Sequence, residues 1–124
     1  MTLYIGLSHT STTEVTHSLT AIELGSGDLP VLATPAMIAL MENAAMLTVA
    51  TLLPEGSTTV GSLVNVSHLK ASPIKCAIKA IATLTEIEGR KLTFSVRAED
   101  ETGLIGEGSH IRYIVDRNKF MAKF

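Results

Sequence analysis

The stretch that decides the fold is "ATPAMIALMENAAMLTVATLL", residues 33–53. Plotted at about 100° per residue, both sides of this segment are apolar. Such a pattern predicts a helix that is buried on every face. Yet the segment carries one carboxylate, that of Glu42. Because a buried carboxylate is costly unless it is paired, protonated or used in chemistry, the position of Glu42 calls for a functional or structural explanation.

The start of this helix is marked by Thr34, which directly precedes Pro35. A hydroxyl at the N-cap followed by proline at the first helical position favours a helix start, so we expect Thr34 to be the N-cap. The same hydroxyl also lies where backbone N–H groups and the helix dipole stabilise a developing negative charge. The sequence "LPEGS" at 53–57 is expected to end the helix.

The rest of the chain is rich in the period-two alternation of half-buried strands. We expect strands within residues 14–22, 58–71, 74–87, 90–100 and 104–116. The linkers "EGR" and "DETG" are short enough for hairpins. Each predicted strand has one polar face and one apolar face. This pattern predicts an antiparallel sheet with one face in solvent and the other packed on the helix. The predicted fold is therefore α+β, with one long helix among roughly five strands, in a single domain over residues 1–124.

Composition limits the partners that the chain is expected to have. Of its 124 residues, 46% are hydrophobic and 18% are charged, which suggests apolar surface buried between subunits. The net charge of −2 does not predict the extended basic surface that binds nucleic acid. The single Cys76 fits a reducing compartment, and the N-terminal stretch has no basic, apolar leader pattern. We expect a cytoplasmic oligomer that binds neither nucleic acid nor membrane.

Among the histidines, His68 is the strongest functional candidate. It ends a run of Val60, Val64 and Val66 on one covered strand face. His9 is more simply explained as a surface residue and His17 as a satisfied structural histidine. His110 neighbours Arg112 on the same strand face, and both are more simply explained as ordinary cross-strand polar partners. No group of His, Cys and carboxylates has the spacing of a zinc site, so no metal is expected.

Two interpretations of Glu42 remain open on the residues alone. It could accept hydrogen bonds at a subunit contact, for example from Asn43 of a second copy. It could equally be a general base or nucleophile whose pKa is raised by burial. Gly61 interrupts a strand, which indicates either a β-bulge or close approach of a ligand to the backbone.

Four segments carry a resemblance to a known family: "LATPAMIALMENAA", "GSLVNVSHLKASP", "EIEGRKLTFSVRAED" and "IGEGSHIRYIVDRNKF". They resemble the hotdog-fold thioesterases related to fluoroacetyl-CoA thioesterase, from about Ala33 to about Phe120. The resemblance implies a hotdog fold, in which an antiparallel sheet wraps around one long central helix. It also implies a homodimer with sites near the interface, with a tetramer as an open alternative.

The resemblance further implies a set of site residues. Thr34, Glu42 and His68 fall on the catalytic positions, and Gly61 and Arg112 fall where the family contacts the acyl end of the substrate. The implied activity is hydrolysis of an acyl-CoA thioester, with coenzyme A as part of the substrate and no separate cofactor. Glu42 would activate water or attack the carbonyl itself, and His68 would bond the thioester or protonate the leaving thiolate.

One departure from the family bears on the substrate. The fluoroacetyl-CoA enzymes have aromatic residues before the catalytic threonine, whereas "LGSGDLPVL" at 24–32 contains none. We therefore expect an acyl group other than fluoroacetyl. Three alternatives stay open: a non-catalytic module that binds acyl-CoA or another acyl ligand, a hotdog dehydratase or hydratase, and a structural oligomer.

Overall fold

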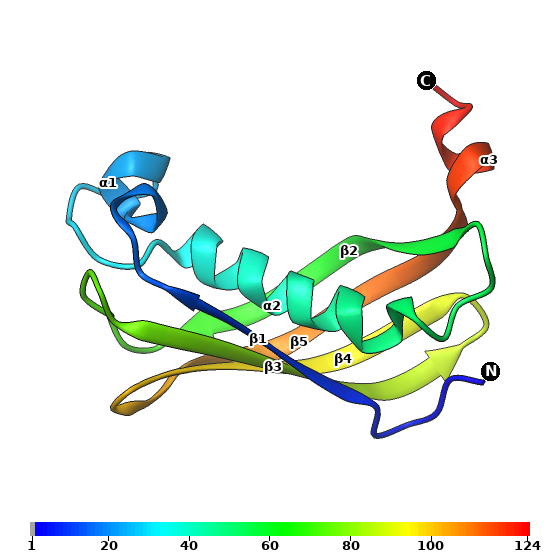
Figure 1. The fold of residues 1–124 in the computed structure, drawn as a ribbon, viewed down its shortest axis with the longest axis horizontal. Coiled ribbons are helices and arrows are strands. Elements are labelled where there is room, and N and C mark those ends of the chain that lie inside the picture. The colour runs from blue at the N-terminus through cyan, green and yellow to red at the C-terminus, as the bar shows by residue number, and fades with distance from the viewer. Residues whose placement is uncertain (1) are drawn as a thin grey trace.

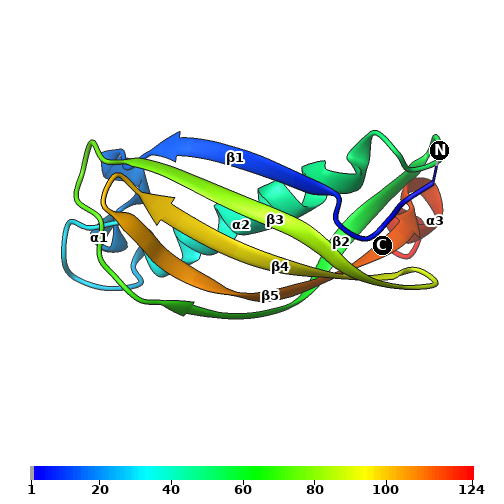
Figure 2. The same cartoon turned by 90° about the horizontal axis from the view of Figure 1, so that it is seen from below.

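The computed structural model describes residues 2–124. Its central element is helix α2 (Thr34–Ala50), which lies across one face of a five-stranded antiparallel sheet that curves around it (Figure 1). The strands are β1 (Ser8–Glu14), β2 (Ser57–His68), β3 (Ala77–Glu88), β4 (Lys91–Asp100) and β5 (Gly103–Asp116). Their order in the sheet is β1-β3-β4-β5-β2, seen in Figure 2. The predicted α+β architecture is thus confirmed.

Three short helical elements complete the chain. They are a 3-10 turn (His17–Leu19), α1 (Ala21–Leu24) and α3 (Arg117–Met121). The first two lie near the start of α2, and α3 lies at the opposite end of the molecule with the C-terminus (Figure 1). None of the helices in residues 2–124 is long and apolar enough to cross a lipid bilayer.

The core lies between α2 and the concave face of the sheet. Every second side chain of β3 and β4 is buried along most of both strands, because alternate side chains of a strand point to one face. These residues and their partners on α2 are Ile78, Ala80, Ala82, Leu84, Leu92, Phe94, Val96, Ala98, Met37, Met41, Ala44, Ala45 and Val49. Burying each large side chain contributes about 1.5–3 kcal/mol, so this layer fixes how α2 sits on the sheet.

Helix α2 is nevertheless not buried on every face within one chain, which corrects the prediction. Ala39, Asn43 and Leu47 are exposed, and the side chain of Glu42 is 39% exposed. The amide oxygen of Asn43 accepts a hydrogen bond from the Ser11 hydroxyl at 2.7 Å, so Asn43 has a partner inside its own chain.

The first strand was predicted at residues 14–22 but lies at Ser8–Glu14, so that prediction is wrong. Residues 17–24 form helical turns instead. Thr20 accepts a hydrogen bond from the Glu23 N–H at 3.4 Å and caps α1, and Gly25 ends it in a left-handed conformation. His17, expected on a covered strand face, is 72% exposed and lies 3.4 Å from Glu23.

Strand β2 is an edge strand with a bulge that changes which side chains face the helix. Its register on β5 shifts between Gly61 and Leu63. Thr59 and Gly61 point inward before the bulge, whereas Val66 and His68 point inward after it. The prediction that Val60 shares a face with Val64 and Val66 is therefore wrong, since an extra residue reverses the alternation. The two predicted hairpin turns are present, at residues 89–90 and 101–102.

Candidate active site

Helix α2 directs a row of side chains toward β2. Thr34, Ile38 and Glu42 follow one another at four-residue steps, the spacing of neighbours on one helix face. The helix and the strand run alongside each other, so Thr34 meets the end of β2 at His68 and Glu42 meets β2 at Gly61. This arrangement creates two polar clusters, one at each end of the row.

The first cluster is the pair Thr34 and His68. The Thr34 hydroxyl oxygen lies 2.7 Å from His68 Nδ1. The predicted N-cap role of Thr34 is wrong: Ala33 is the N-cap, and Thr34 is the first helical residue, so its hydroxyl is free to reach the imidazole. Within the described residues, His68 Nε2 is buried and has no hydrogen-bond partner. Burial lowers the pKa of His68, which favours the neutral ring.

The second cluster gathers around the Glu42 carboxylate. Glu42 Oε2 lies 3.7 Å from Arg112 Nη1 and 3.9 Å from His110 Nε2. The Arg112 guanidinium is itself buried and fixed by Thr59, because Nε donates to the Thr59 hydroxyl at 2.8 Å and Nη2 donates to its carbonyl at 2.9 Å. A fixed, positively charged group therefore faces the carboxylate.

His110 belongs to this cluster, although the sequence suggested only an ordinary cross-strand partner. Its Nδ1 bonds the Leu63 carbonyl at 2.8 Å, and a carbonyl can only accept, so Nδ1 carries the proton. Nε2 then accepts from Arg112 Nη1 at 3.2 Å. Burial lowers the pKa of His110, and the charge of Arg112 acts in the same direction. The imidazole is thus held neutral between backbone and guanidinium.

Gly61 leaves the room that the Glu42 carboxylate occupies. A Cβ at position 61 would lie 2.5 Å from Glu42 Oε2 and 3.4 Å from Arg112 Nη1. Any side chain there would displace the carboxylate. Of the two interpretations of Gly61, the β-bulge is confirmed, and the space beside this glycine is occupied by the Glu42 carboxylate.

One chain does not bring all the predicted catalytic residues together. Thr34 and Glu42 are eight positions apart on α2, which corresponds to about 12 Å along the helix axis. A cavity of about 270 Å³ is lined by Thr34, His68, Val31 and Leu32 but not by Glu42. Within one chain, the site is therefore divided into a Thr34–His68 half and a Glu42–Gly61–Arg112 half.

Two residues of the Glu42 cluster, Thr59 and His110, were not predicted as site candidates from the sequence. Thr59 was hidden by the bulge, since uninterrupted alternation would place it on the outer face. The two-residue spacing of His110 and Arg112 did indicate that both side chains share one strand face, but it gave no reason to prefer a site over ordinary cross-strand contacts. What the spacing could not show is that both lie on the helix side of the sheet.

The family model of the fluoroacetyl-CoA-specific thioesterases matches residues 15–118. The chain belongs to this thioesterase family. It is 37% identical over 93 residues to the fluoroacetyl-CoA thioesterase of Streptantibioticus cattleyicolor, covering 75% of this chain and 67% of the relative. Members of the family are thioesterases, and the chain is a thioester hydrolase by this relationship.

Solved structures agree with this assignment. A structure of fluoroacetyl-CoA thioesterase superposes with a TM-score of 0.93 at 31% identity, over 99% of this chain and 96% of that chain. A Thermus thermophilus hypothetical protein, described as a thioesterase superfamily member, gives 0.91 at 30% identity, over 99% and 91% of the two chains. A hot-dog-like protein of Thermanaerovibrio acidaminovorans gives 0.87 at 22% identity, over 96% and 88%, which shows the hotdog fold alone.

Proposed function

We propose that the protein is an acyl-CoA thioesterase that works as a homodimer, with each active site shared between two copies. Thr34 and His68 would come from one copy, and Glu42, Gly61 and Arg112 from the other. The observation that carries this proposal is the division of the site into two halves on one helix face, both at β2. In the described part of the chain, the Thr34–His68 half has an imidazole nitrogen without a hydrogen-bond partner but no carboxylate. The Glu42 half has a carboxylate, but its imidazole, His110, already accepts a hydrogen bond from Arg112.

The free edge of β2 provides a way to join the halves. Among residues 2–124, β2 pairs only with β5 and has no second neighbour in the sheet. If two β2 strands pair antiparallel about a two-fold axis near Asn65, His68 of one copy lies beside Gly61 of the other. The axis is perpendicular to the sheet, so both α2 helices stay on the same face. Such pairing would also cover the partly exposed row of Ile38, Glu42 and Met46.

The proposed reaction uses the groups of both halves. Glu42 removes a proton from water as the water attacks the thioester carbonyl, or it attacks the carbonyl itself to give an anhydride that water then hydrolyses. The C–S bond breaks in either route, and coenzyme A leaves as a thiolate that takes up a proton. If Thr34 donates to Nδ1 of His68, the Nε2–H of that ring is free to bond the carbonyl oxygen or protonate the sulfur.

The acyl group is proposed to be larger than fluoroacetyl. Residues 25–30, which precede the helix, are exposed and contain no aromatic side chain. The cavity beside Thr34 and His68 is lined on part of its surface by the aliphatic side chains of Val31, Leu32 and Leu69, and elsewhere by polar groups such as Ser26 and Lys70. The aliphatic part of the lining would favour alkyl chains by burying them.

The proposal is tested by thiol release from a panel of acyl-CoA thioesters from acetyl and fluoroacetyl to decanoyl. We expect turnover, with kcat/KM higher for alkyl chains longer than two carbons than for fluoroacetyl-CoA. Glu42→Gln and His68→Ala should each lower kcat by about 100-fold or more, since each removes a proton-transfer group. Ser67→Ala, on the outer face of the same strand, is the matched control and should keep full activity.

Two results would contradict the proposal. Thermal stabilisation by acyl-CoA without any thiol release would favour the alternative of a non-catalytic binding module. Full turnover in both variants would show that the reaction, if present, does not use these residues.

A further inference from the structure

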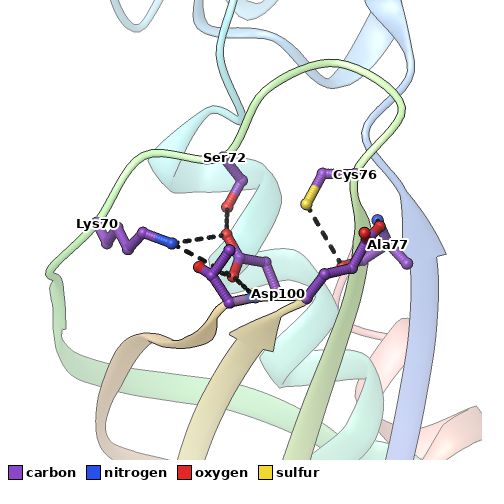
Figure 3. Close-up of polar contacts among 7 residues, drawn as sticks. Lys70, Ser72, Cys76, Ala77 and Asp100 are labelled. Carbon is purple, nitrogen blue, oxygen red and sulfur yellow. Dashed lines mark hydrogen bonds and ion pairs between the residues drawn. The ribbon is translucent and has the colours of Figure 1, made fainter.

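A buried carboxylate outside the two half-sites joins the β4–β5 hairpin to the loop that follows His68. Asp100, at the end of β4, has a side chain only 1% exposed. It accepts hydrogen bonds from the Ser72 hydroxyl at 2.9 Å and from the Thr102 N–H and hydroxyl at 2.7 Å each. Lys70 Nζ lies 3.4 Å away (Figure 3). The bonds from Thr102 hold the pKa of Asp100 well below its usual range, so the group stays an anion.

Ser72 connects this carboxylate to both segments of the first half-site. Its side chain is fully buried and its carbonyl accepts from the Leu32 N–H at 2.9 Å. Leu32 is two residues before Thr34, and Ser72 is four residues after His68. Together with the neighbouring bridge between Val31 and Pro73, Ser72 therefore bonds the segment entering α2 to the segment leaving β2.

The hairpin does not need Ser72 for its own turn. The two bonds from Thr102 close the turn between β4 and β5 within residues 100–102. The bond from Ser72 adds nothing to that turn but fixes the loop, which arches over the end of β4 on its way from β2 to β3 (Figure 3). The N–H groups of Leu69 and Lys70 donate to the Ile105 carbonyl at 2.7 and 3.3 Å, and the Ser72 bond adds a second restraint two residues further along this loop.

We propose that Ser72 and Asp100 are positioning residues, which hold the Thr34 hydroxyl against the His68 imidazole. Asp100 anchors Ser72 to the sheet, and Ser72 sets the spacing between the segments that carry Thr34 and His68. The effect on catalysis rests on the proposed function, whereas the effect on the geometry of His68 does not. Neither residue touches the reacting atoms in this account.

The test compares Ser72→Ala with Thr102→Ala. Both changes remove one hydroxyl donor from the same carboxylate, the first from the loop and the second from the hairpin. We expect Ser72→Ala to lower kcat by about tenfold or more with KM nearly unchanged, because misplacement of a reacting group affects the chemical step. Thr102→Ala should keep the wild-type kcat and KM.

NMR titration of the histidine side chains gives a readout that does not depend on activity. In Ser72→Ala, the pKa of His68 should rise toward 6.5, because a released ring is less buried. His110 lies in the other half-site and serves as the internal reference, so its titration should not move. Asp100→Asn should change His68 in the same direction, and adding Ser72→Ala to it should have no further effect.

Three outcomes would overturn the inference. Unchanged kcat and unchanged His68 titration in Ser72→Ala would leave the pair a purely structural role. An equal shift of His68 and His110 would indicate general loosening. Additive effects of Ser72→Ala and Asp100→Asn would show that the two residues act separately. If the wild-type protein releases no thiol, the proposed function fails, but the titrations still decide whether Ser72 positions His68.

Discussion

At the scale of single residues, the space around Gly61 decides whether the Glu42 carboxylate can sit between Arg112 and the strand. The missing Cβ of Gly61 leaves this space open. The carboxylate lies at the end of a flexible side chain, so a small intruding group would move it without disturbing the core. Activity and stability should therefore respond very differently to a change at this position.

We predict that Gly61→Ala lowers kcat by about tenfold or more while shifting Tm by only about 1–3 °C. The added methyl would lie 2.5 Å from Glu42 Oε2 and push the carboxylate away from its place beside Arg112. Thiol-release kinetics and thermal unfolding measure the two effects. Wild-type kcat in Gly61→Ala would show that the position of this carboxylate is unimportant.

The buried imidazole of His110 should make stability sensitive to acid. Its pKa in the folded protein lies below the reference value of 6.5, because burial and Arg112 disfavour the charged ring. As pH falls below about 6.5, the unfolded chain therefore binds the proton first, and the free energy of unfolding decreases. Above that pH the contribution is fully retained.

We predict that His110→Gln flattens the pH dependence of unfolding as the pH falls below about 6.5. Part of the slope should remain, because burial lowers the pKa of His68 as well. Urea unfolding at several pH values measures this slope. Identical slopes in the variant and the wild type would show that His110 does not titrate with folding.

The sequence indicated five candidate site residues, but it did not show how they group. Thr34, Glu42 and His68 were predicted as one catalytic set, and the structure pairs only Thr34 with His68 in one chain. Glu42 instead faces Arg112 and His110. The grouping depends on the bulge in β2 and on the distance between Thr34 and Glu42 along the axis of α2. The alternation of apolar and polar residues in the sequence indicates neither.

At the scale of elements, the covered faces of β3 and β4 were predictable because alternation and burial agree there. The first strand was not, since "SHTSTTE" lacks an apolar alternation and qualifies only by its β-branched threonines. Residues 20–23 instead carry a sequence pattern of a helix start, because Thr20 is followed three residues later by Glu23, the spacing of a capping box. The helix cap at Thr20 therefore decided the local structure, and the alternation of apolar and polar residues at 14–22 did not.

The pairing of β2 with β5 depends on a glycine that the half-sites do not use. A Cβ at Gly108 would clash with the backbone of Asn65 and Val66 on the neighbouring strand. Backbone cannot move aside as a side chain can. The two strands can therefore lie this close together only because Gly108 has no side chain.

We predict that Gly108→Ala lowers the free energy of unfolding by about 1–3 kcal/mol, the cost of overpacking a well-fitted site. Ser109→Ala, one residue further along the same strand, is the matched control and should change it by less than about 0.5 kcal/mol. Urea unfolding measures both. Equal stability of the two variants would show that β5 can move away from β2 at little cost.

At the scale of the whole molecule, the proposed dimer accounts for features that a single chain leaves unexplained. Glu42 and Met46 are only partly covered, and β2 has an unpaired edge. Natural proteins seldom leave a long strand edge open without protection. A second copy on this edge would cover both the strand and the row of side chains on α2.

We predict a dimer in solution that Met46→Glu converts to a monomer, because the new carboxylate would lie in the covered row. Leu47→Glu, one residue on, points away from that row and should leave the dimer intact, since Leu47 is already 38% exposed. Light scattering after size exclusion measures the mass. A dimeric Met46→Glu variant would place the interface elsewhere.

The most direct test of the shared active site is activity in hybrid dimers. Glu42→Gln and His68→Ala are each expected to be inactive alone. In a mixed dimer one site receives both changes, while the other combines an intact Thr34–His68 pair with an intact Glu42. After unfolding and refolding an equimolar mixture, we predict thiol release at about a quarter of the wild-type rate, since half of the dimers are hybrids with one good site. Activity that stays at the level of the separate variants would contradict the shared site.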